Sequence, residues 1–433
     1  MKQSANDARA AAPSGRYKWA VVAMLWFICF FNYADRQAIF SIFPLLEAEY
    51  GFTEEQLGRI GSAFTLVYAI TAPFAGQVGD RFPRKLVILG GLYVWSIVTG
   101  FTSLCTKVWH FVLVRASEGL GETFYFPASM SLVSDYHSKR TRSRAMSIHQ
   151  TSVYAGTIGG GALAGWMGQT YGWWSSFVVL AVAGVVLGLV LTVFIREPQR
   201  NEAERAESGG ADALHPPATM PWSTFLAGLL RNPTAIMLMV AFFGANFVGL
   251  VFLTWMPTFL AKDFKQSLAA AGVGATVFIQ VGSMLGSIVG GTLADRWSHG
   301  RPGARIGVQS LGLLLGTPFI YLCGSTSELS ILMVGMSFFG FFKGLYDANI
   351  WASLYDVIPP ARRGSAVGVM NMVGWFGGGL GSYSLGWAVT ERGMTMGAVI
   401  ASTALIYLIV GCVLVLVALL LAPRDIRKAA IEQ

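Results

Sequence analysis

Long apolar runs separated by short polar connections fill this chain from residue 18 to residue 422. Most runs have about 20 residues or more, enough for an α-helix to cross a hydrocarbon core of roughly 30 Å. The first six runs are 18–46, 56–79, 86–105, 109–134, 144–169 and 174–195, and the second six are 232–261, 268–294, 304–323, 329–356, 363–389 and 395–422. The pattern predicts an all-α membrane protein with twelve transmembrane helices. Apolar and polar residues do not alternate within the runs, which disfavours a transmembrane β-barrel.

One connection is longer and more polar than the others. Residues 196–222 read REPQRNEAERAESGGADALHPPATMPW, a stretch rich in charges that also contains proline and glycine. This composition is typical of a linker between two folded units. We therefore expect an N-terminal six-helix bundle over 1–195, a cytoplasmic linker over 196–222 and a C-terminal six-helix bundle over 223–433.

The cationic residues are distributed unequally between the two sides of the predicted membrane. When both termini and the linker are placed on one side, few of the 31 Lys and Arg residues fall elsewhere. The opposite side holds Arg59, Lys107, Lys262, Lys265 and Arg392, and the spans hold Arg36, Arg115 and Lys343. Because Lys and Arg accumulate on the cytoplasmic side of membrane proteins, we expect both termini in the cytoplasm. The net charge of +8 is then explained by orientation, and no nucleic-acid partner is needed.

Composition narrows the possible functions further. The chain is 54% hydrophobic and only 12% charged, whereas a soluble protein has about 25% charged residues. Its four cysteines show no C-x-x-C spacing, and we find no phosphate-binding loop and no clustered Ser/His/Asp set. We therefore expect no metal, no cofactor and no enzymatic activity.

The two predicted halves repeat each other's motifs. G-x-x-x-D-R ends the second span of each half, in GQVGDRFPRK (76–85) and GTLADRWS (291–298). The fifth and eleventh spans contain glycine-rich segments, 156–165 and 374–382, and small residues let helices approach closely. Repeated six-helix halves with a site near the membrane midplane are typical of secondary transporters.

Three ionisable residues interrupt the fourth span, in the segment RASEGLGETFYFP (115–127). A charge at the membrane centre costs about 2.5–3.5 kcal/mol or more, so such groups are expected to line a cavity or to pair. Arg115, Glu118 and Glu122 share one helical face. We expect Glu122 to be the main proton carrier, with Arg115 as its ion-pair partner and as the group that binds a substrate phosphate or carboxylate. A structural ion-pair set that holds helices together is the alternative.

The first and tenth spans carry further charges. Asp35 and Arg36 are adjacent and point about 100° apart, so at most one of them is expected to face the cavity centre. Asp35 is the second candidate proton carrier, with a clamp between helices as the alternative. Lys343 and Asp347 are four residues apart and can pair with each other, which leaves open both a self-contained pair and a role in substrate binding.

Charged residues also follow the second and eighth spans at the predicted cytoplasmic rim. We expect them to form a gate that latches the two halves and releases on opening. For the basic residues, a role as ordinary topology signals is the alternative. The expected gate residues are Gly76, Asp80, Arg81, Arg84, Lys85, Asp295 and Arg296.

Several motifs together resemble the major facilitator superfamily. The twelve spans, the central loop and G-x-x-x-D-R-x-x-R-[RK] in Gly76–Lys85 are similar to that superfamily. Within it, three motifs resemble the Spinster branch of lysophospholipid and sphingosine-1-phosphate transporters. They are N-Y-A-D-R (Asn32–Arg36), R-x-x-x-G-x-G-E-x-x-Y (Arg115–Tyr125) and R-E-P (Arg196–Pro198), and G-D-R-F-P-R-K (Gly79–Lys85) resembles the same branch.

The resemblance implies proton-coupled, alternating-access transport of a lysolipid-like amphiphile, with Asp35, Arg115 and Glu122 at the coupling and substrate site. It also implies a monomer in the lipid bilayer of a bacterial inner membrane. Glu118 departs from the family, which has an apolar residue there. The expected substrate-binding residues are Arg115, Arg36, Glu118, Tyr125, Lys343 and Asp347. The alternatives are a transporter of small organic anions such as sugar acids, a transporter of drug-like amphiphiles, and a non-transporting membrane sensor or scaffold.

Overall fold

The computed structural model describes residues 16–199, 203, 222–298, 301–359 and 362–431. Nearly all of these residues lie in helices, and no strand occurs among them. Eight helices of the described chain are long and apolar enough to span a membrane by length and composition. Four further spans are broken or richer in polar residues, which confirms the twelve-helix membrane fold that the apolar runs predict.

The first six spans form the N-terminal half, with one additional short helix, α2 (Phe43–Tyr50), after the first span. The spans are α1 (Tyr17–Ser41), α3 (Glu54–Arg81), α4 (Arg84–Thr102), the broken pair α5 (Val108–Glu122) and α6 (Tyr125–Tyr136), α7 (Lys139–Tyr171) and α8 (Trp174–Phe194). Most of the predicted linker 196–222 lies outside the described residues.

The second six spans form the C-terminal half and follow the short helix α10 (Trp222–Leu230). They are α11 (Pro233–Lys262), α12 (Leu268–Ser298), α13 (Ala304–Ser325), the broken pair α14 (Leu329–Asp347) and α15 (Ile350–Val357), and α16 (Arg363–Arg392). The last span is built from α17 (Met396–Ser402), α18 (Ala404–Leu416) and the π-helix η2 (Val417–Leu421), and it continues into α19 (Ala422–Ile431).

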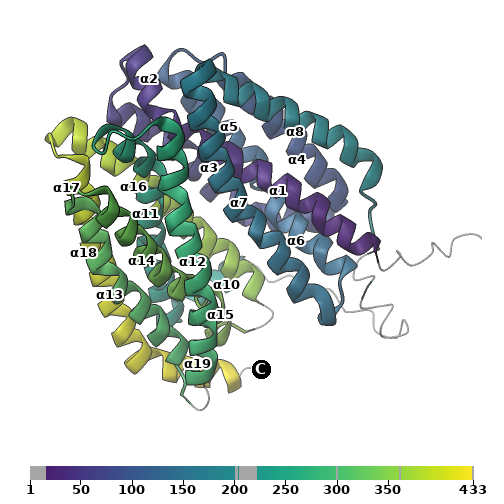
Figure 1. Ribbon diagram of the computed structural model, residues 1–433. Helices are drawn as coiled ribbons and strands as arrows, with labels where there is room; N and C mark the ends of the chain where they lie inside the picture. The colour runs from purple at the N-terminus through teal and green to yellow at the C-terminus, as the bar shows by residue number, and fades with distance from the viewer. Residues whose placement is uncertain (1–15, 200–202, 204–221, 299–300, 360–361, 432–433) are drawn as a thin grey trace, which may run out of the picture.

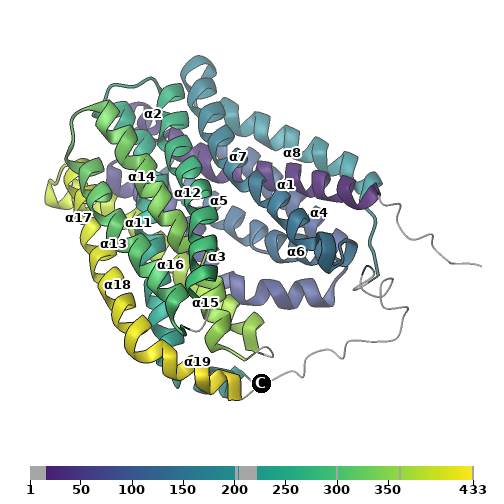
Figure 2. The same ribbon diagram turned by 60° about the horizontal axis from the view of Figure 1, so that its bottom comes forward.

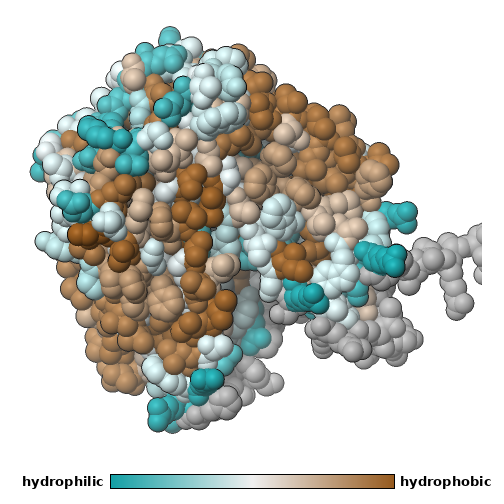
Figure 3. Space-filling view, in the orientation of Figure 1, coloured by the Kyte–Doolittle hydropathy of each residue, from teal (hydrophilic) through white to brown (hydrophobic). Residues whose placement is uncertain are grey.

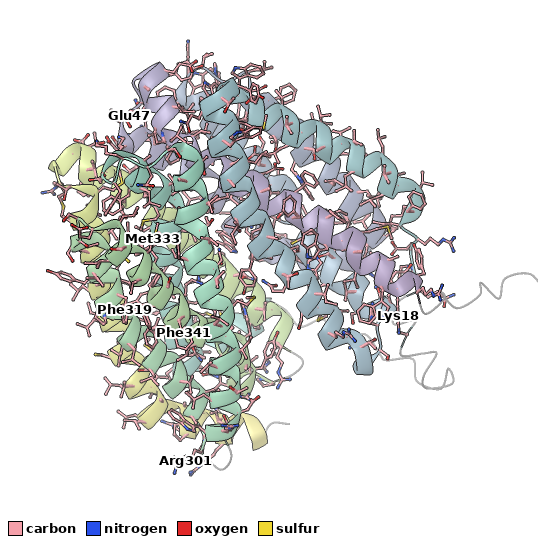
Figure 4. All side chains as sticks on the ribbon, in the orientation of Figure 1. Lys18, Glu47, Arg301, Phe319, Met333 and Phe341 are labelled. Atoms are coloured by element: carbon pink, nitrogen blue, oxygen red, sulfur yellow. The ribbon has the colours of Figure 1, made fainter. Side chains whose placement is uncertain are left out.

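The two halves form adjoining bundles, α1–α8 and α11–α18 (Figure 1). They meet at the end that carries α2 and α17 and diverge toward the opposite end, and Figure 2 shows the same bundles from another side. Figure 4 places Glu47 at the first end, and Lys18 and Arg301 toward the other. These are the closed end and the open end of the molecule. The distribution of Lys and Arg predicts that the open end is cytoplasmic.

The outer surface of the bundles is apolar, as a membrane requires. On α8, one side carries a row of exposed aliphatic side chains, Val182, Val186, Leu189 and Val193. Figure 3 shows hydrophobic colour over the outer parts of both halves, with a paler recess between them in the lower part of the view. Apolar side chains therefore face outward, and the polar residues concentrate between the bundles and at the two ends.

Glycine allows the backbones of neighbouring helices to touch. A Cβ atom at Gly160 in α7 would overlap the backbone of Ala34 in α1, and a Cβ at Gly119 in α5 would lie 2.6 Å from the carbonyl oxygen of Phe64 in α3. Any larger residue at these positions would push the helices apart. The glycine-rich segment of the fifth span thus serves to hold α7 against α1, next to the charged residues of the first span.

The closed end is sealed by contacts between the halves. Lys262 at the end of α11 forms ion pairs with Glu47 and, at 3.0 Å, with Glu54 at the start of α3. The side chain of Thr53 caps α3 in a capping box with Gln56, which fixes where this helix begins. Gly161 of α7 and Gly272 of α12 meet directly, since a Cβ on Gly161 would lie 2.8 Å from the carbonyl oxygen of Gly272.

The halves separate unevenly toward the open end. Along α3 and α16 they stay close, from Gly58 beside Ser382 to Gly368, where a Cβ would lie 3.6 Å from Cα of Pro73. The contact of α7 with α12, in contrast, lies near Gly161, and the residues of α7 closer to the open end line a cavity. Figures 1 and 2 both show α7 and α12 diverging in that direction. The gap between the halves therefore widens on the α7–α12 side.

Two spans that the sequence predicts as continuous are broken. The fourth span stops at Glu122 and resumes at Tyr125, because Pro127 cannot donate the helical hydrogen bond to the carbonyl of Thr123. The tenth stops at Asp347 and resumes at Ile350. Each first segment therefore ends on an acidic residue, at equivalent places in the two halves. Broken helices near the membrane midplane frequently mark binding sites in transporters.

Candidate functional site

A cavity of about 450 Å³ lies between the two halves. Both halves supply polar groups to its wall, and aromatic and aliphatic side chains line the rest. The charged residues are Arg36, Arg115, Lys343 and Asp347. The glutamines are Gln37, Gln150 and Gln280. The apolar wall includes Phe40, Phe64, Phe242, Leu250, Trp351 and Trp375.

Arg36 and Glu122 form the innermost ion pair of the cavity. Nε of Arg36, on α1, lies 2.5 Å from Oε2 of Glu122, the last residue of α5. Arg36 lines the cavity, whereas Glu122 is fully buried and does not. A ligand in the cavity therefore reaches Arg36 directly and reaches Glu122 only after Arg36 moves.

Arg115 pairs with Glu118, one helical turn away on α5. The predicted pairing of Arg115 with Glu122 is therefore wrong in this structure. Seven residues of helix separate those two groups by about 10 Å along the axis, and α1 brings Arg36 to Glu122 instead. Arg115 lines the cavity, and Glu118 is 1% exposed and accepts a hydrogen bond from Thr102 at 3.3 Å.

Asp35 points away from the cavity into the N-terminal bundle. It is 2% exposed, and Thr99 of α4 donates a hydrogen bond to its Oδ2 at 3.4 Å. Its other carboxylate oxygen has no hydrogen-bond partner among the described residues. Of the adjacent pair Asp35 and Arg36, only Arg36 lines the cavity.

Aromatic rings surround the guanidinium of Arg36. Its central carbon lies 4.6 Å from the ring centre of Tyr33, 4.8 Å from Phe64 and 4.9 Å from Tyr68. Trp375 of the C-terminal half adds a fourth ring at 5.6 Å, next to the ring of Tyr68. Nη1 of Arg36 and Nε of Arg115 have no hydrogen-bond acceptor among the described residues, so both retain capacity to bind an anion.

The C-terminal half contributes Lys343 and Asp347 of α14, which pair with each other and both line the cavity. Their side chains are 26% and 37% exposed, so they are more accessible than the Arg36–Glu122 and Arg115–Glu118 pairs. Tyr154 of α7 also lines the cavity. The N-terminal half thus lines the cavity with arginines that are paired to buried glutamates, and the C-terminal half lines it with a more accessible Lys–Asp pair.

Tyr125 does not lie in the cavity, so the expectation that it binds substrate is wrong in this structure. It is 1% exposed, does not line the cavity, and donates a hydrogen bond to the carbonyl oxygen of Leu25 at 2.8 Å. Its hydroxyl also lies 3.1 Å from Nε2 of His149. Tyr125 therefore packs α6 against α1 and α7.

The ion pairs and hydrogen bonds that the structure gives for the expected gate residues Arg84, Lys85 and Asp295 each lie on one side of the gap between the bundles. Arg84 pairs with Asp135 at 2.7 Å and with Glu197 at 3.4 Å, all within the N-terminal half. Lys85 donates to the carbonyl oxygen of Thr192 at 2.7 Å. In the other half Asp295 pairs with Arg305 at 3.2 Å. Arg81 and Arg296 are exposed, and the side chains of Gly76 and Asp80 lie outside the described residues.

Further contacts between the halves seal the closed end, and the sequence alone does not predict them. Besides Lys262, Glu55 of α3 accepts a hydrogen bond from Tyr383 of α16 at 3.0 Å and pairs with Arg59 at 2.5 Å. These hydrogen bonds, from Arg59 first and then from Tyr383, lower the pKa of Glu55. Only the pairing of Glu55 with Arg59, four residues apart, could have been read from the sequence.

The described residues contain no group of three His, Cys, Asp or Glu side chains placed to hold a metal ion. The named side chains of the cavity offer hydrogen bonds and ion pairs. This chemistry suits binding and release of a small molecule.

Comparisons with known proteins agree on one family. A family model described as the Major Facilitator Superfamily matches residues 25–382 and 260–431. The probable galactarate/D-glucarate transporter GudP of Bacillus subtilis is 27% identical over 418 residues, covering 91% of each chain. Protein spinster homolog 1 of Homo sapiens is 28% identical over 394 residues, covering 86% of this chain and 73% of that protein.

The same fold occurs in a solved structure of a bacterial homologue of the human lysosomal transporter Spinster, in an inward-facing, unoccupied conformation. The TM-score is 0.76 at 21% sequence identity, covering 96% of this chain and 99% of the other. At this level of identity the likeness establishes the arrangement of the helices.

Proposed function

From the premise that the chain belongs to the Major Facilitator Superfamily, whose members are membrane transporters and not enzymes, we propose that it moves an anionic amphiphile by proton-coupled alternating access. The favoured substrate class is a lysophospholipid or a sphingosine-1-phosphate-like molecule. The relatives named as spinster proteins support this class. The protein acts as a monomer in a bacterial inner membrane, with both termini in the cytoplasm.

One observation carries the proposal: free guanidinium donors stand beside an aromatic wall in one cavity. Nη1 of Arg36 and Nε of Arg115 are buried and have no acceptor among the described residues, and both side chains line the cavity. We infer that a phosphate or carboxylate takes these unused donors once the side chains that cover them shift. Phe242 and Trp351, whose ring centres are 5.2 Å apart, form part of the apolar wall. A molecule with an anionic head and an apolar tail satisfies both surfaces, whereas a purely polar solute leaves the aromatic wall without a partner.

The uneven separation of the halves also supports an amphiphile. The bundles remain in contact along α3 and α16 but part between α7 and α12, where Val153 and Tyr154 face Ser287 across the cavity. An opening on one side lets an acyl chain remain beside the bundles while its head group occupies the cavity. A small hydrophilic solute has no apolar chain that would use a lateral opening between α7 and α12.

Glu122 and the substrate anion compete for Arg36. Both are anionic when Glu122 is ionised, and a guanidinium binds carboxylate and phosphate by the same planar fork. A proton on Glu122 removes its charge and frees Arg36 for the substrate. Loss of that proton restores the Arg36–Glu122 ion pair and displaces the substrate. Proton and anion therefore occupy the site together.

A small polar anion such as a sugar acid is the second candidate. Gln37, Gln150 and Gln280 line the cavity from three helices and offer both donors and acceptors to hydroxyl groups. Relatives named as galactarate/D-glucarate and hexuronate transporters support this class.

Counterflow in liposomes separates the candidates. Purified protein is reconstituted, and exchange of a labelled lysophospholipid and of a labelled hexarate is measured against protein-free vesicles. Trp351→Gln is expected to reduce lysolipid exchange about tenfold or more, since it removes a large apolar contact. Trp387→Gln, at an exposed position remote from the cavity lining, serves as the control.

Each outcome has a distinct meaning. Exchange of the lysolipid that depends on Trp351 supports the proposal. Exchange of the hexarate alone, reduced by Gln280→Leu and not by Trp351→Gln, transfers support to the second candidate. Binding without exchange of either compound would identify a sensor and overturn the assignment as a transporter of these substrates.

A further inference from the structure

A second cavity, of about 280 Å³, lies at the open end of the C-terminal half, away from the central cavity. Its walls come from α10, the start of α11, the end of α15 and α19. Asn232 fixes this corner: its Nδ2 donates to the carbonyl oxygen of Val357 at 2.8 Å, and its Oδ1 accepts from the backbone of Ala235. The cavity is therefore held open by hydrogen bonds between helix ends.

Three cations line this cavity: Arg231, Arg362 and Lys428. None of them forms an ion pair with a carboxylate in the part of the chain that the structure describes. The one acidic residue in the wall, Asp425, is occupied elsewhere. Its Oδ2 accepts from the backbone nitrogen of Thr234 at 3.1 Å and from the hydroxyl of Thr234 at 2.6 Å. The cavity thus has an excess of uncompensated positive charge.

Arg362 is turned into the cavity by its surroundings. A Cβ on Gly228 of α10 would lie 2.8 Å from Nη1 of Arg362, so the absence of a side chain at Gly228 makes room for the guanidinium. The next residue, Arg363, behaves differently and donates to the carbonyl oxygens of Ile358 and Tyr355 at 3.3 and 3.0 Å. One arginine of the pair therefore closes the end of α15, and the other remains available to a ligand.

Apolar side chains border the same cavity on the outer side. Phe225 and Leu229 bury one face of α10 against the bundle, whereas Leu226 and Leu230 are 42% and 71% exposed. The nearby π-helix at the end of the last span also presents an exposed leucine pair, Leu419 and Leu420. A cationic cavity with an apolar border at the end of the membrane spans matches the head group and upper acyl chains of a lipid.

We propose that this cavity binds the phosphate of an anionic phospholipid from the leaflet at the open end. Basic pockets between helices on the cytoplasmic side are suited to such head groups, since that leaflet is negatively charged. Inorganic phosphate or a soluble phosphate ester would meet the same three cations, but it would leave Leu226 and Leu230 without a partner. The site is separate from the transport cavity and does not depend on which substrate that cavity moves.

The test uses full-length protein in nanodiscs of phosphatidylcholine. Binding of labelled phosphatidylglycerol is measured for the wild type, for Arg362→Gln/Lys428→Gln, and for Arg427→Gln. Arg427 is an exposed cation on the same helix that does not line the cavity. The double variant is expected to bind about tenfold or more weakly, with the control unchanged. Arg231→Gln, at an exposed position of the rim, provides a milder variant whose folding is not in question, with a smaller loss expected.

A second arm separates the two sources of phosphate. Inorganic phosphate and glycerol phosphate are added as competitors of labelled phosphatidylglycerol in the same nanodiscs. Weak competition together with the variant effect supports a lipid site. Competition by glycerol phosphate as strong as that of unlabelled phosphatidylglycerol would overturn the lipid assignment in favour of a soluble ligand. Equal binding by the wild type, the double variant and Arg231→Gln would overturn the site itself.

Discussion

The guanidinium carbon of Arg36 lies 5.6 Å from the ring centre of Trp375, across the boundary between the two halves of the molecule. The other rings around this guanidinium, on Tyr33, Phe64 and Tyr68, belong to the same half as Arg36. Rocking of one half against the other therefore moves Trp375 relative to Arg36 while the remaining rings stay with it. Because Trp375 moves, the surroundings of the Arg36–Glu122 ion pair differ between the conformations of the transporter.

Replacement of Trp375 by leucine is expected to weaken substrate binding. Trp375 lines the cavity, and the loss of part of its apolar contact with the substrate is expected to cost about 1–2 kcal/mol, a loss of about 5- to 30-fold in affinity. Isothermal titration calorimetry with the substrate measures the effect, because its signal does not depend on tryptophan fluorescence. Trp387→Leu is the matched control, since that ring lies 5.2 Å from the guanidinium carbon of Arg392, outside the cavity. Equal affinity in Trp375→Leu and wild type would show that this ring contributes nothing.

Replacement of Gly272 by valine is expected to force the closed end apart. A Cβ at this position overlaps the backbone of Gly161, and an overpacked contact costs about 1–3 kcal/mol. If this cost destabilises only the state in which the closed end is sealed, the equilibrium between that state and the state open at this end shifts about 5- to 150-fold toward the latter. Spin labels at the exposed positions Glu49 and Ser267 report the separation across the closed end.

The control for that experiment is Gly291→Val on the same helix, because a Cβ at Gly291 meets no atom within 4 Å. The label distance should lengthen in Gly272→Val and stay unchanged in the control. A label distance that stays at the wild-type value in a folded Gly272→Val protein would contradict the role of this contact in sealing the closed end.

Acid is expected to loosen the closed end through Glu55, which lies outside the predicted span 56–79. The hydrogen bonds from Arg59 and Tyr383 lower the pKa of Glu55, and Tyr383 belongs to the opposite half. Because its pKa is lowered, ionised Glu55 stabilises the closed end fully at pH values above its ordinary pKa of about 4.3. This stabilisation is lost as the pH falls through the lowered pKa. The closed state should therefore weaken only at pH values below about 4.

The same pair of spin labels, followed as a function of pH, measures this response. Glu55→Gln should reduce the transition, since its side chain no longer titrates, while the ion pairs of Lys262 with Glu47 and Glu54 remain. Glu328→Gln, at an exposed position that starts α14, should leave the transition in place. An acid transition that persists unchanged in Glu55→Gln would assign it to another group.

Membrane orientation follows from the distribution of Lys and Arg and can be tested directly. In a Cys412→Ser background the remaining native cysteines, Cys29, Cys105 and Cys323, are buried. Arg301→Cys is expected to react with a membrane-impermeant thiol reagent only after cells are opened, whereas Glu49→Cys reacts in intact cells. The reverse pattern would place the open end outside the cell.

The sequence predicts most of the fold because each span can be recognised from its own run of apolar residues. Apolar length identifies the helices, and Lys and Arg predict their orientation. The helix breaks after Glu122 and Asp347 were missed, since apolar length does not report a local loss of hydrogen bonds. Pro127 was the available signal for the first break. The second break follows Asp347 at Ala348 and Asn349, a position without a comparable marker.

The candidate site was predicted in part for a related reason. Helical periodicity places Arg115 and Glu118 on one face, and they do pair. The partner of Glu122 is Arg36, 86 residues earlier in the chain. Spacing along one helix contains no information about that contact, which depends on how α1 packs against α5. The same limit explains why Tyr125 was expected in the cavity and why the ion pairs of Lys262 with Glu47 and Glu54 were not expected at the closed end.

The central claim is that Glu122 carries the coupling proton by exchanging with substrate at Arg36, and one comparison tests it most directly. Gradient-driven uptake and counterflow are measured in liposomes for the wild type, Glu122→Gln and Asp35→Asn, with Glu328→Gln as the control. Glu122→Gln should retain counterflow but lose the roughly tenfold accumulation that one pH unit can drive per proton. Full gradient-driven accumulation in Glu122→Gln would contradict the account, and loss of accumulation in Asp35→Asn alone would assign the coupling proton to Asp35.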